Sequence, residues 1–115
     1  TDDDFVVSDD GYRSRTFTYR QIAGGSHDFA RRLRSVGISA GDKIVLWSEN
    51  RAEWVAVLWG SLLEGVVLVP VDYRSSAELV LRIADIVEAK VIVIGETVGE
   101  LQTERRVWQI KRAAF

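Results

Sequence analysis

Three runs of consecutive apolar residues dominate the chain, and none of them alternates with polar residues. They begin at Ile44, Val66 and Val91 and read Ile-Val-Leu-Trp, Val-Val-Leu-Val and Val-Ile-Val-Ile. Unbroken, β-branched runs are typical of strands that are covered on both faces, as in a parallel sheet. Their separation along the chain suits compact strand-helix-strand units. The pattern therefore predicts a parallel sheet built from these three runs.

The segments before and between the runs carry signals for helices. Each begins with a capping box, which is a side chain that can accept from a backbone N–H of the first helical turn, followed three positions later by Glu or Gln. Apolar residues with helical spacing come next. The three pairs are Thr18 with Gln21, Asn50 with Glu53, and Ser75 with Glu78. With right-handed crossovers, alternating helices and strands build an α/β fold, a layered parallel sheet with flanking helices on both faces.

Several glycines lie within the predicted helices or at their ends. Gly24 and Gly25 lie inside the first predicted helix, where each costs roughly 1 kcal/mol relative to Ala, so tight packing or a local distortion is expected there. Gly60 is interpreted as a close-packing position in the second helix. Gly65 is interpreted as the residue that ends that helix.

The two ends of the chain are less clearly patterned. Residues 1–115 are expected to form a single α/β subdomain, with a less regular N-terminal segment over residues 1–15. Beyond Gly95, residues Thr97 to Glu104 are predicted as a short helix, and Val107 to Ile110 as a short strand.

Composition narrows the classes of function. Apolar residues make up 47% and charged residues 28% of the chain, which describes a globular protein. Fifteen basic and seventeen acidic residues give a net charge of −2, so no basic excess points to nucleic acid. There is no Cys, and therefore no disulfide or thiolate site. Without an apolar run of about 18 residues or a signal-peptide pattern, no membrane span and a cytoplasmic location are expected.

Candidate ligand-binding residues follow the predicted strands, because ligands of open α/β sheets bind beyond the carboxyl ends of strands. Asn50 and Glu53 have the spacing of a helix start, which we prefer to a ligand role. Asp72 has the position of a ribose or metal carboxylate, but with no second acid beside it a turn-forming role is favoured. Arg74 could meet an anion, although a surface position is the commoner case.

The remaining candidate residues do not match the pattern of a phosphate-binding, metal-binding or catalytic site. The stretch from Gly95 to Gly99 lacks the Lys and hydroxyl residue of a phosphate loop. His27 has no second His or Cys for a metal site and no paired nucleophile. Trp47, Trp54 and Trp59 are expected in the core, or facing a region outside this chain. No catalytic, cofactor-binding or metal-binding residue is assigned.

Five short motifs occur in an order and spacing that resemble the N-terminal part of AMP-forming acyl-CoA ligases and related adenylating enzymes. They are Thr18-Tyr19, Gly41-Asp42, Asn50 to Glu53, Gly65 to Pro70, and Glu78-Leu79. The loop from Asp72 to Ser76 and the tryptophan-rich helix are most similar to those of fatty-acyl-CoA ligases.

The resemblance implies an enzyme that uses ATP and Mg²⁺ to convert a carboxylic acid, here a fatty acid, to an acyl-adenylate and pyrophosphate, after which coenzyme A displaces AMP. The motifs that carry this chemistry in the family do not occur in the sequence: the Ser/Thr/Gly-rich loop ending in Pro-Lys, the Tyr-Gly-x-Thr-Glu segment, the ribose-binding Asp and the C-terminal lysine. The chain is therefore expected to be an N-terminal fragment and scaffold, inactive alone, whose partner is the remainder of its own polypeptide.

The alternative is a stand-alone flavodoxin-like binding or regulatory module, with a phosphoacceptor receiver domain as its sharpest version. A receiver needs an acidic pair after the first strand, an Asp after a middle strand and a Lys after a late one. Asp72 supplies one of these groups, whereas Ser48-Glu49-Asn50 offers a single acid and no suitable Lys follows Ile94. A fragment, in contrast, predicts exposed apolar surface.

Overall fold

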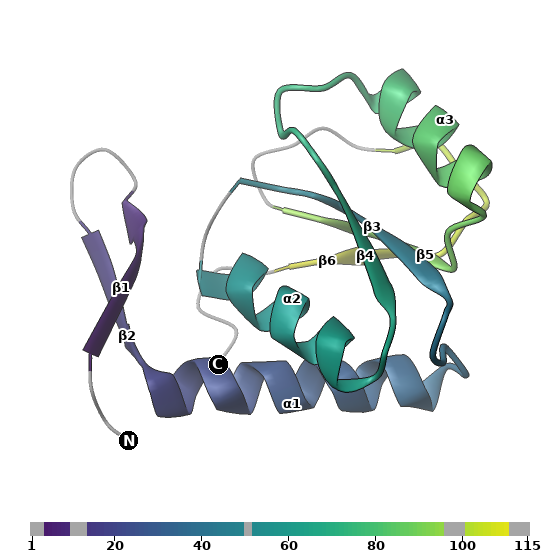
Figure 1. The fold of residues 1–115 in the computed structure, drawn as a ribbon. Helices are drawn as coiled ribbons and strands as arrows, with labels where there is room; N and C mark the ends of the chain where they lie inside the picture. The colour runs from purple at the N-terminus through teal and green to yellow at the C-terminus, as the bar shows by residue number, and fades with distance from the viewer. Residues whose placement is uncertain (1–3, 10–13, 50–51, 96–100, 111–115) are drawn as a thin grey trace.

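The computed structural model describes residues 4–9, 14–49, 52–95 and 101–110 (Figure 1). Within them lie three helices, α1 (Tyr19–Ser35), α2 (Ala52–Leu63) and α3 (Ala77–Val87). The strands are β1 (Asp4–Asp9), β2 (Ser14–Thr18), β3 (Lys43–Trp47), β4 (Val67–Val71), β5 (Val91–Ile94) and β6 (Val107–Gln109). The predicted alternation of helices and strands is confirmed from α1 to β5.

Four strands form a parallel sheet in the order β4-β3-β5-β6. The three apolar runs supply β3, β4 and β5, so the predicted parallel sheet is confirmed. The strand predicted near the C-terminal end is β6, which pairs with β5. In this order β3 lies inside the sheet, and β4 forms one edge.

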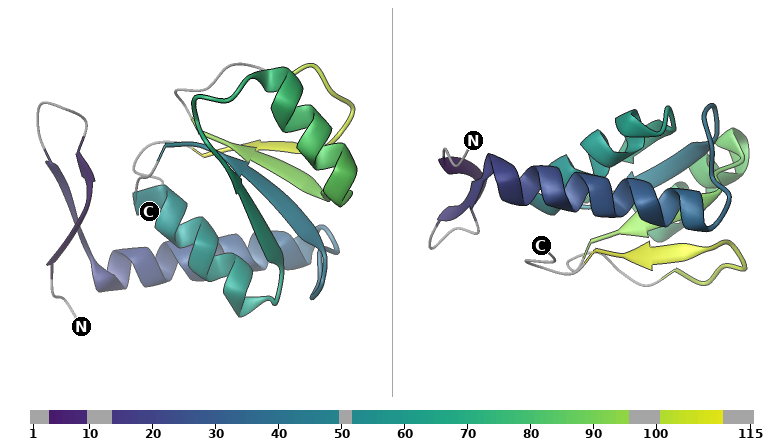
Figure 2. Two further views of the ribbon diagram at one scale, coloured as in Figure 1. Left: turned by 45° about the horizontal axis from the view of Figure 1, so that its top comes forward. Right: turned by 90° about the horizontal axis from the view of Figure 1, so that it is seen from below.

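Helices cover both faces of the sheet, with α1 and α2 on one side and α3 on the other (Figures 1 and 2). Because side chains alternate along a strand, β3 sends Ile44 and Leu46 toward Leu33 of α1 and Val57 of α2. The alternate residues Val45 and Trp47 pack with Val80 and Ala84 of α3. The side chains of residues 44–47 are at most 3% exposed. This two-sided burial explains why the runs contain no polar residue.

The helices α1 and α2 approach closely at Gly60. A Cβ on this residue would lie 2.7 Å from the carbonyl oxygen of Ser26 and 3.0 Å from the Phe29 ring, which confirms the close packing predicted there. Gly65 follows the end of α2 with φ of +69°, a left-handed conformation that favours glycine, so the predicted helix end is also confirmed.

Two local predictions are wrong. At Gly24 neither tight packing nor a distortion is present, because α1 runs through it without interruption and a Cβ there would meet nothing within 4 Å, whereas its neighbour Gly25 is buried. The cap of α3 is Ser76, whose Oγ accepts from the Leu79 backbone N–H at 3.1 Å, and not Ser75. Ser75 belongs to the preceding turn, since its backbone N–H donates to the Asp72 carbonyl at 2.9 Å. The caps predicted at Thr18 and Asn50 lie outside the side chains that the structure describes.

The N-terminal segment is more regular than expected. Strands β1 and β2 pair as an antiparallel hairpin with a register shift between Val6 and Ser8. The Asp10-Gly11 dipeptide between them is a common hairpin signal. Of the short helix predicted from Thr97 to Glu104, residues 101–104 are not helical, and residues 97–100 lie outside the described part.

Candidate functional site

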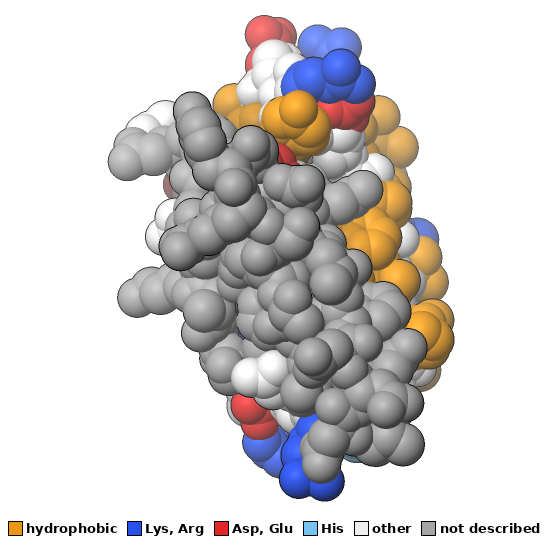
Figure 3. Space-filling model, turned by 90° about the vertical axis from the view of Figure 1, so that its left-hand side faces the viewer, with side chains coloured by type: hydrophobic (Ala, Val, Ile, Leu, Met, Phe, Trp, Pro, Cys, Tyr) orange, Lys and Arg blue, Asp and Glu red, His pale blue; other side chains and the backbone are white. Residues whose placement is uncertain are grey.

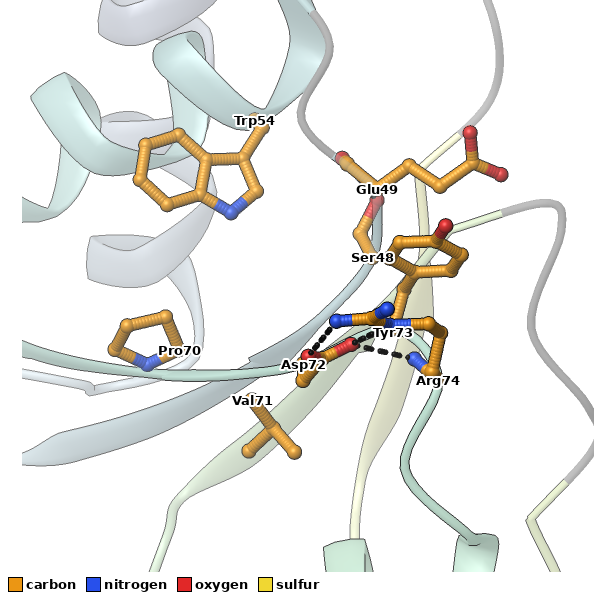
Figure 4. Close-up of a pocket in the computed structure, with 8 residues that line it drawn as sticks. All are labelled: Ser48, Glu49, Trp54, Pro70, Val71, Asp72, Tyr73 and Arg74. Carbon is orange, nitrogen blue, oxygen red and sulfur yellow. Dashed lines mark hydrogen bonds and ion pairs between the residues drawn. The ribbon is translucent and has the colours of Figure 1, made fainter.

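A hollow of about 440 Å³ opens at the carboxyl ends of β3 and β4 (Figure 4). It lies at the end of the sheet where open α/β folds bind ligands. The segments that directly follow β3 and β4 contribute to it, and α2 adds one residue. Its lining consists of Ser48, Glu49, Trp54, Pro70, Val71, Asp72, Tyr73 and Arg74.

Asp72 and Arg74 form a closed pair on the rim of this hollow. The Asp72 carboxylate accepts from the Arg74 backbone N–H at 2.8 Å, from Nε at 3.2 Å and from Nη2 at 3.0 Å. These bonds fold the chain into a turn directly after β4, which is the role predicted for Asp72. Arg74 is exposed as expected, but its charge is matched by Asp72.

The pair shifts the titration of both partners. Side-chain and then backbone hydrogen bonds from Arg74 hold the pKa of the Asp72 carboxyl below its ordinary value. The Asp72 carboxylate in turn raises the pKa of the Arg74 guanidinium. An anion approaching Arg74 would therefore have to compete with a carboxylate already bound there.

The other lining residues are mainly apolar, and the Ser48 hydroxyl is bonded to the backbone of the next residue. Trp54 and Pro70 lie along one side of the hollow, and Tyr73 lies next to Arg74, whose guanidinium carbon is 5.8 Å from the ring centroid (Figure 4). Ser48 Oγ donates to the Glu49 carbonyl at 3.0 Å. Among these lining residues no hydroxyl is paired with a base. The arrangement can hold part of a ligand.

The ends of β3 and β5 are in direct contact. The strand order reverses direction between these two strands, which is where ligands of doubly wound sheets usually bind. The Gly95 backbone N–H donates to the Trp47 carbonyl at 3.0 Å, and a Cβ on Gly95 would lie 2.4 Å from Ser48 Oγ. The rest of the stretch predicted from Gly95 to Gly99 lies outside the described residues, as does Asn50.

The remaining candidate residues lie away from the hollow or inside the core. His27 is exposed on α1. Trp47 is 3% exposed, as predicted, and Trp54 is half-buried. Trp59 is 53% exposed, so of the two predicted alternatives it does not take the place in the core.

In the described part of the chain, His, Asp and Glu side chains form no group of three that could hold a metal ion. No helix in that part of the chain combines the length and the hydropathy needed to cross a bilayer.

Comparison with known proteins gives one consistent family. The family described as AMP-binding enzyme matches residues 1–114. The probable acyl-activating enzyme 16, chloroplastic, of Arabidopsis thaliana is 41% identical over 68 residues, which are 59% of this chain and 9% of that protein. The long-chain-fatty-acid–CoA ligase FadD15 of Mycobacterium bovis is 34% identical over 87 residues, which are 68% of this chain and 14% of that protein.

Among solved structures, the crystal structure of IdnL1 superposes with a TM-score of 0.78 at 25% identity. The superposition covers 92% of this chain and 22% of that one. The chain thus spans a small part of the length of the proteins that it matches.

Proposed function

The chain belongs to the AMP-binding enzyme family, and from that membership we propose that it is the scaffold part of an ATP-dependent, AMP-forming carboxylate–CoA ligase. The observation that carries the proposal is the family match over residues 1–114, which includes the whole parallel sheet. The similarity to a long-chain-fatty-acid–CoA ligase supports a fatty acid as the carboxylate and coenzyme A as the acceptor.

The proposed reaction has two steps. A carboxylate oxygen attacks the α-phosphorus of ATP, which forms the acyl-adenylate and releases pyrophosphate. The coenzyme A thiol then attacks the acyl carbon, and AMP leaves. Both steps require groups that neutralise developing negative charge.

The described residues do not fit a Mg²⁺–ATP complex. The single guanidinium that lines the hollow, that of Arg74, is bonded to Asp72, and no group of three acidic or His side chains gathers in the described part. A triphosphate needs several unpaired cationic or N–H donors, and Mg²⁺ needs oxygen ligands. We therefore assign ATP, Mg²⁺ and coenzyme A to the remainder of the ligase and derive no catalytic step from this chain.

In this proposal the segment has a structural role, which is to position one wall of the ligase cleft. The sheet holds the ends of β3 and β4 side by side, and the Asp72–Arg74 turn fixes the direction in which the chain leaves β4. In this proposal the hollow at those ends forms one wall of the ligase cleft. The segment is expected to be inactive alone.

Pyrophosphate exchange tests the proposal in two arms. In the first, the purified chain with ATP, Mg²⁺ and palmitate is expected to give no ATP–pyrophosphate exchange above a blank. In the second, residues 1–114 replace the matching segment of FadD15, and the chimera is expected to exchange. Exchange by the chain alone, or a folded chimera without exchange, would overturn the proposal.

One observation favours the alternative of a flavodoxin-like module. The first strand of the parallel sheet lies inside and the second at the edge, which is the strand order of that fold. Against it, Ser48-Glu49-Asn50 after the first strand of this sheet offers a single acid, whereas a receiver module needs two. Acetyl phosphate separates the two, because stoichiometric labelling of Asp72 is expected only of a receiver module.

A further inference from the structure

Another hollow, of about 590 Å³, lies at the end of the sheet where the strands begin, opposite the hollow at the ends of β3 and β4. The starts of β3, β5 and β6 meet the end of α1 there (Figures 1 and 2). We call it the strand-start hollow. It is lined by residues 36–38, which follow α1, and by Asp42, Lys90, Glu104 and Arg106. A volume of this size suits a small molecule.

Basic residues stand at the starts of three neighbouring strands. Lys43 is the first residue of β3, Lys90 directly precedes β5, and Arg106 directly precedes β6. The Lys90 backbone N–H donates to the Lys43 carbonyl at 2.8 Å, and the Ile92 N–H donates to the Arg106 carbonyl at 2.9 Å. These bonds hold the three positions side by side. Like charges on neighbouring strands destabilise a sheet, so this row has a cost that a bound anion would remove.

The three cations have no acidic partner, in contrast to five arginines elsewhere in the fold. In the part of the chain that the structure describes, Lys43, Lys90 and Arg106 are exposed and form no ion pair or side-chain hydrogen bond. The paired arginines are Arg31 with Asp28, Arg34 with Glu64, Arg74 with Asp72, Arg82 with Glu78, and Arg105 with Asp85. Positive charge is thus left unmatched at this end of the sheet.

The two acids of the strand-start hollow are placed differently from each other. Asp42 Oδ2 accepts from the Ser39 backbone N–H at 2.9 Å. Glu104 is exposed, and among the described residues it has no ion pair or side-chain hydrogen bond. Two cations and one carboxylate therefore line the hollow without neutralising one another. A ligand that matches all three needs an anionic group and an amine.

The end of α1 offers little repulsion to an anion, because carbonyls of its last turn are already bonded. The Leu33 carbonyl accepts from the Val36 and Ile38 N–H groups at 3.3 and 3.0 Å. The Arg34 carbonyl accepts from the Gly37 N–H at 3.1 Å. The negative end of a helix dipole resides mainly in carbonyls that lack such partners.

We propose that the strand-start hollow binds a small phosphate ester that also carries an amine. The Arg106 guanidinium offers paired N–H donors that match phosphate oxygens, and the Lys90 ammonium adds a second positive charge. Lys43 beside them raises the local positive potential. Glu104 accepts from the amine of the ligand. This site goes beyond the proposed ligase function and does not depend on it.

The surface around the hollow favours a soluble ligand over a lipid surface. Hydrophobic side chains gather along one margin of the molecule, as seen from its opposite end (Figure 3). Of the large apolar side chains exposed in the described part, Val36 alone lines the strand-start hollow. A membrane-binding surface usually has a broad apolar side beside its basic residues, which this end of the sheet does not provide.

Calorimetric titration tests the proposal with three probes that separate the two charges of the ligand. O-phosphoethanolamine carries both, inorganic phosphate carries the anion, and ethanolamine carries the amine. Each probe is titrated into the 115-residue chain and into the FadD15 chimera, with FadD15 as the blank. The variants are Lys90→Gln, Arg106→Gln and Glu104→Gln. Arg82→Gln is the control, because it removes a cation of α3 that does not line the hollow.

O-phosphoethanolamine is expected to bind about two- to fivefold more tightly than phosphate, since it adds one exposed ion pair. Lys90→Gln and Arg106→Gln are each expected to weaken both phosphate probes by about five- to tenfold, through loss of a charge-assisted hydrogen bond. Glu104→Gln is expected to make the two phosphate probes bind equally. Ethanolamine alone is not expected to bind, and Arg82→Gln is expected to change nothing.

Three outcomes would overturn the inference. Absence of phosphate binding above the blank in both proteins would show that the cations are only solvated surface charges. Equal weakening by Arg82→Gln and Lys90→Gln would show that net charge, and not the hollow, attracts the anion. Binding to phosphatidylethanolamine vesicles without binding to the soluble probe would assign the hollow to a lipid surface.

Discussion

Gly95 at the end of β5 lies directly against Ser48 at the end of β3. A Cβ on Gly95 would fall 2.4 Å from Ser48 Oγ and 3.0 Å from Ser48 Cβ. The Gly95 N–H also donates to the carbonyl of Trp47, the residue before Ser48, at 3.0 Å. This contact holds the ends of β3 and β5 together where the strand order reverses, and the hollow described above lies at the ends of β3 and β4.

Gly95→Ala is expected to lower the free energy of unfolding by about 1–3 kcal/mol, because a methyl group would overpack the contact with Ser48. Urea denaturation measures this loss. In the Ser48→Ala background the loss is expected to shrink by more than about 0.5 kcal/mol, since the nearest clashing atom is gone. Strictly additive effects of the two substitutions would contradict the contact.

Two helical glycines are expected to respond in opposite directions to the same change. Gly60→Ala forces a methyl group toward the Ser26 carbonyl in the α1–α2 contact and is expected to destabilise the fold by about 1–3 kcal/mol. Gly24→Ala serves as the matched control, because it adds a methyl group in open space on α1. It is expected to stabilise the fold by up to about 1 kcal/mol. Thermal unfolding of both variants would show whether their signs differ.

The pKa of Asp72 is expected to depend on Arg74. Arg74→Gln removes the hydrogen bonds that lower this pKa, so the carboxyl is expected to titrate at a higher pH in the variant, as followed by NMR of the side-chain carbon. Since the folded-state pKa is depressed, the pair stabilises the fold above the unfolded-state pKa of Asp72. That stabilisation is lost as the pH falls through the lower folded-state value.

Arg82→Gln is the control for this titration. Arg82 lies near Glu78 on α3, with 3.6 Å between Nη2 and Oε1, and its replacement is expected to leave the pKa of Asp72 unchanged. An equal rise in both variants would mean that general charge, and not the Asp72–Arg74 pair, sets the titration.

Arg105 is expected to matter more than an ordinary surface arginine, because it ties the segment before β6 to α3. Its Nε and Nη2 donate to Asp85 at 3.1 and 2.8 Å, and its Nη1 donates to the Ala89 carbonyl at 2.7 Å. Arg105→Ala is expected to destabilise the fold by about 1–2 kcal/mol and to speed amide exchange in β6. Arg82→Ala removes a more exposed pair and is expected to change stability by less than about 0.5 kcal/mol.

The parallel sheet could be predicted from the sequence because a strand that is buried on both faces has apolar residues at consecutive positions. Ile44 to Trp47 contains no polar residue since alternate side chains enter two different cores. The hairpin of β1 and β2 was not predicted, because its strands contain no long apolar run, although an Asp-Gly pair stands between them in the sequence. The cap of α3 was placed one residue early because Ser75 and Ser76 both fit the pattern, and the turn at Asp72 decides between them.

Some contacts in the site could likewise be predicted from the sequence, and others could not. The Asp72–Arg74 turn joins residues two positions apart, so its turn-forming part could be predicted. The closure of Gly95 against Ser48 joins separate strands and depends on how closely their ends approach. The exposure of Trp59 could be predicted only as one of two alternatives, because an apolar helix face has the same sequence whether or not this chain covers it.

The most direct test of the central claim is ATP–pyrophosphate exchange by the FadD15 chimera that carries residues 1–114 of this chain. If the chain is the scaffold of an AMP-forming ligase, the chimera is expected to exchange with palmitate at a rate within about tenfold of FadD15, which corresponds to about 1.4 kcal/mol in the barrier. The same chimera with Gly60→Leu, which should disrupt the α1–α2 contact, is expected to lose exchange. A chimera that folds with native-like stability yet forms no acyl-adenylate would contradict the account.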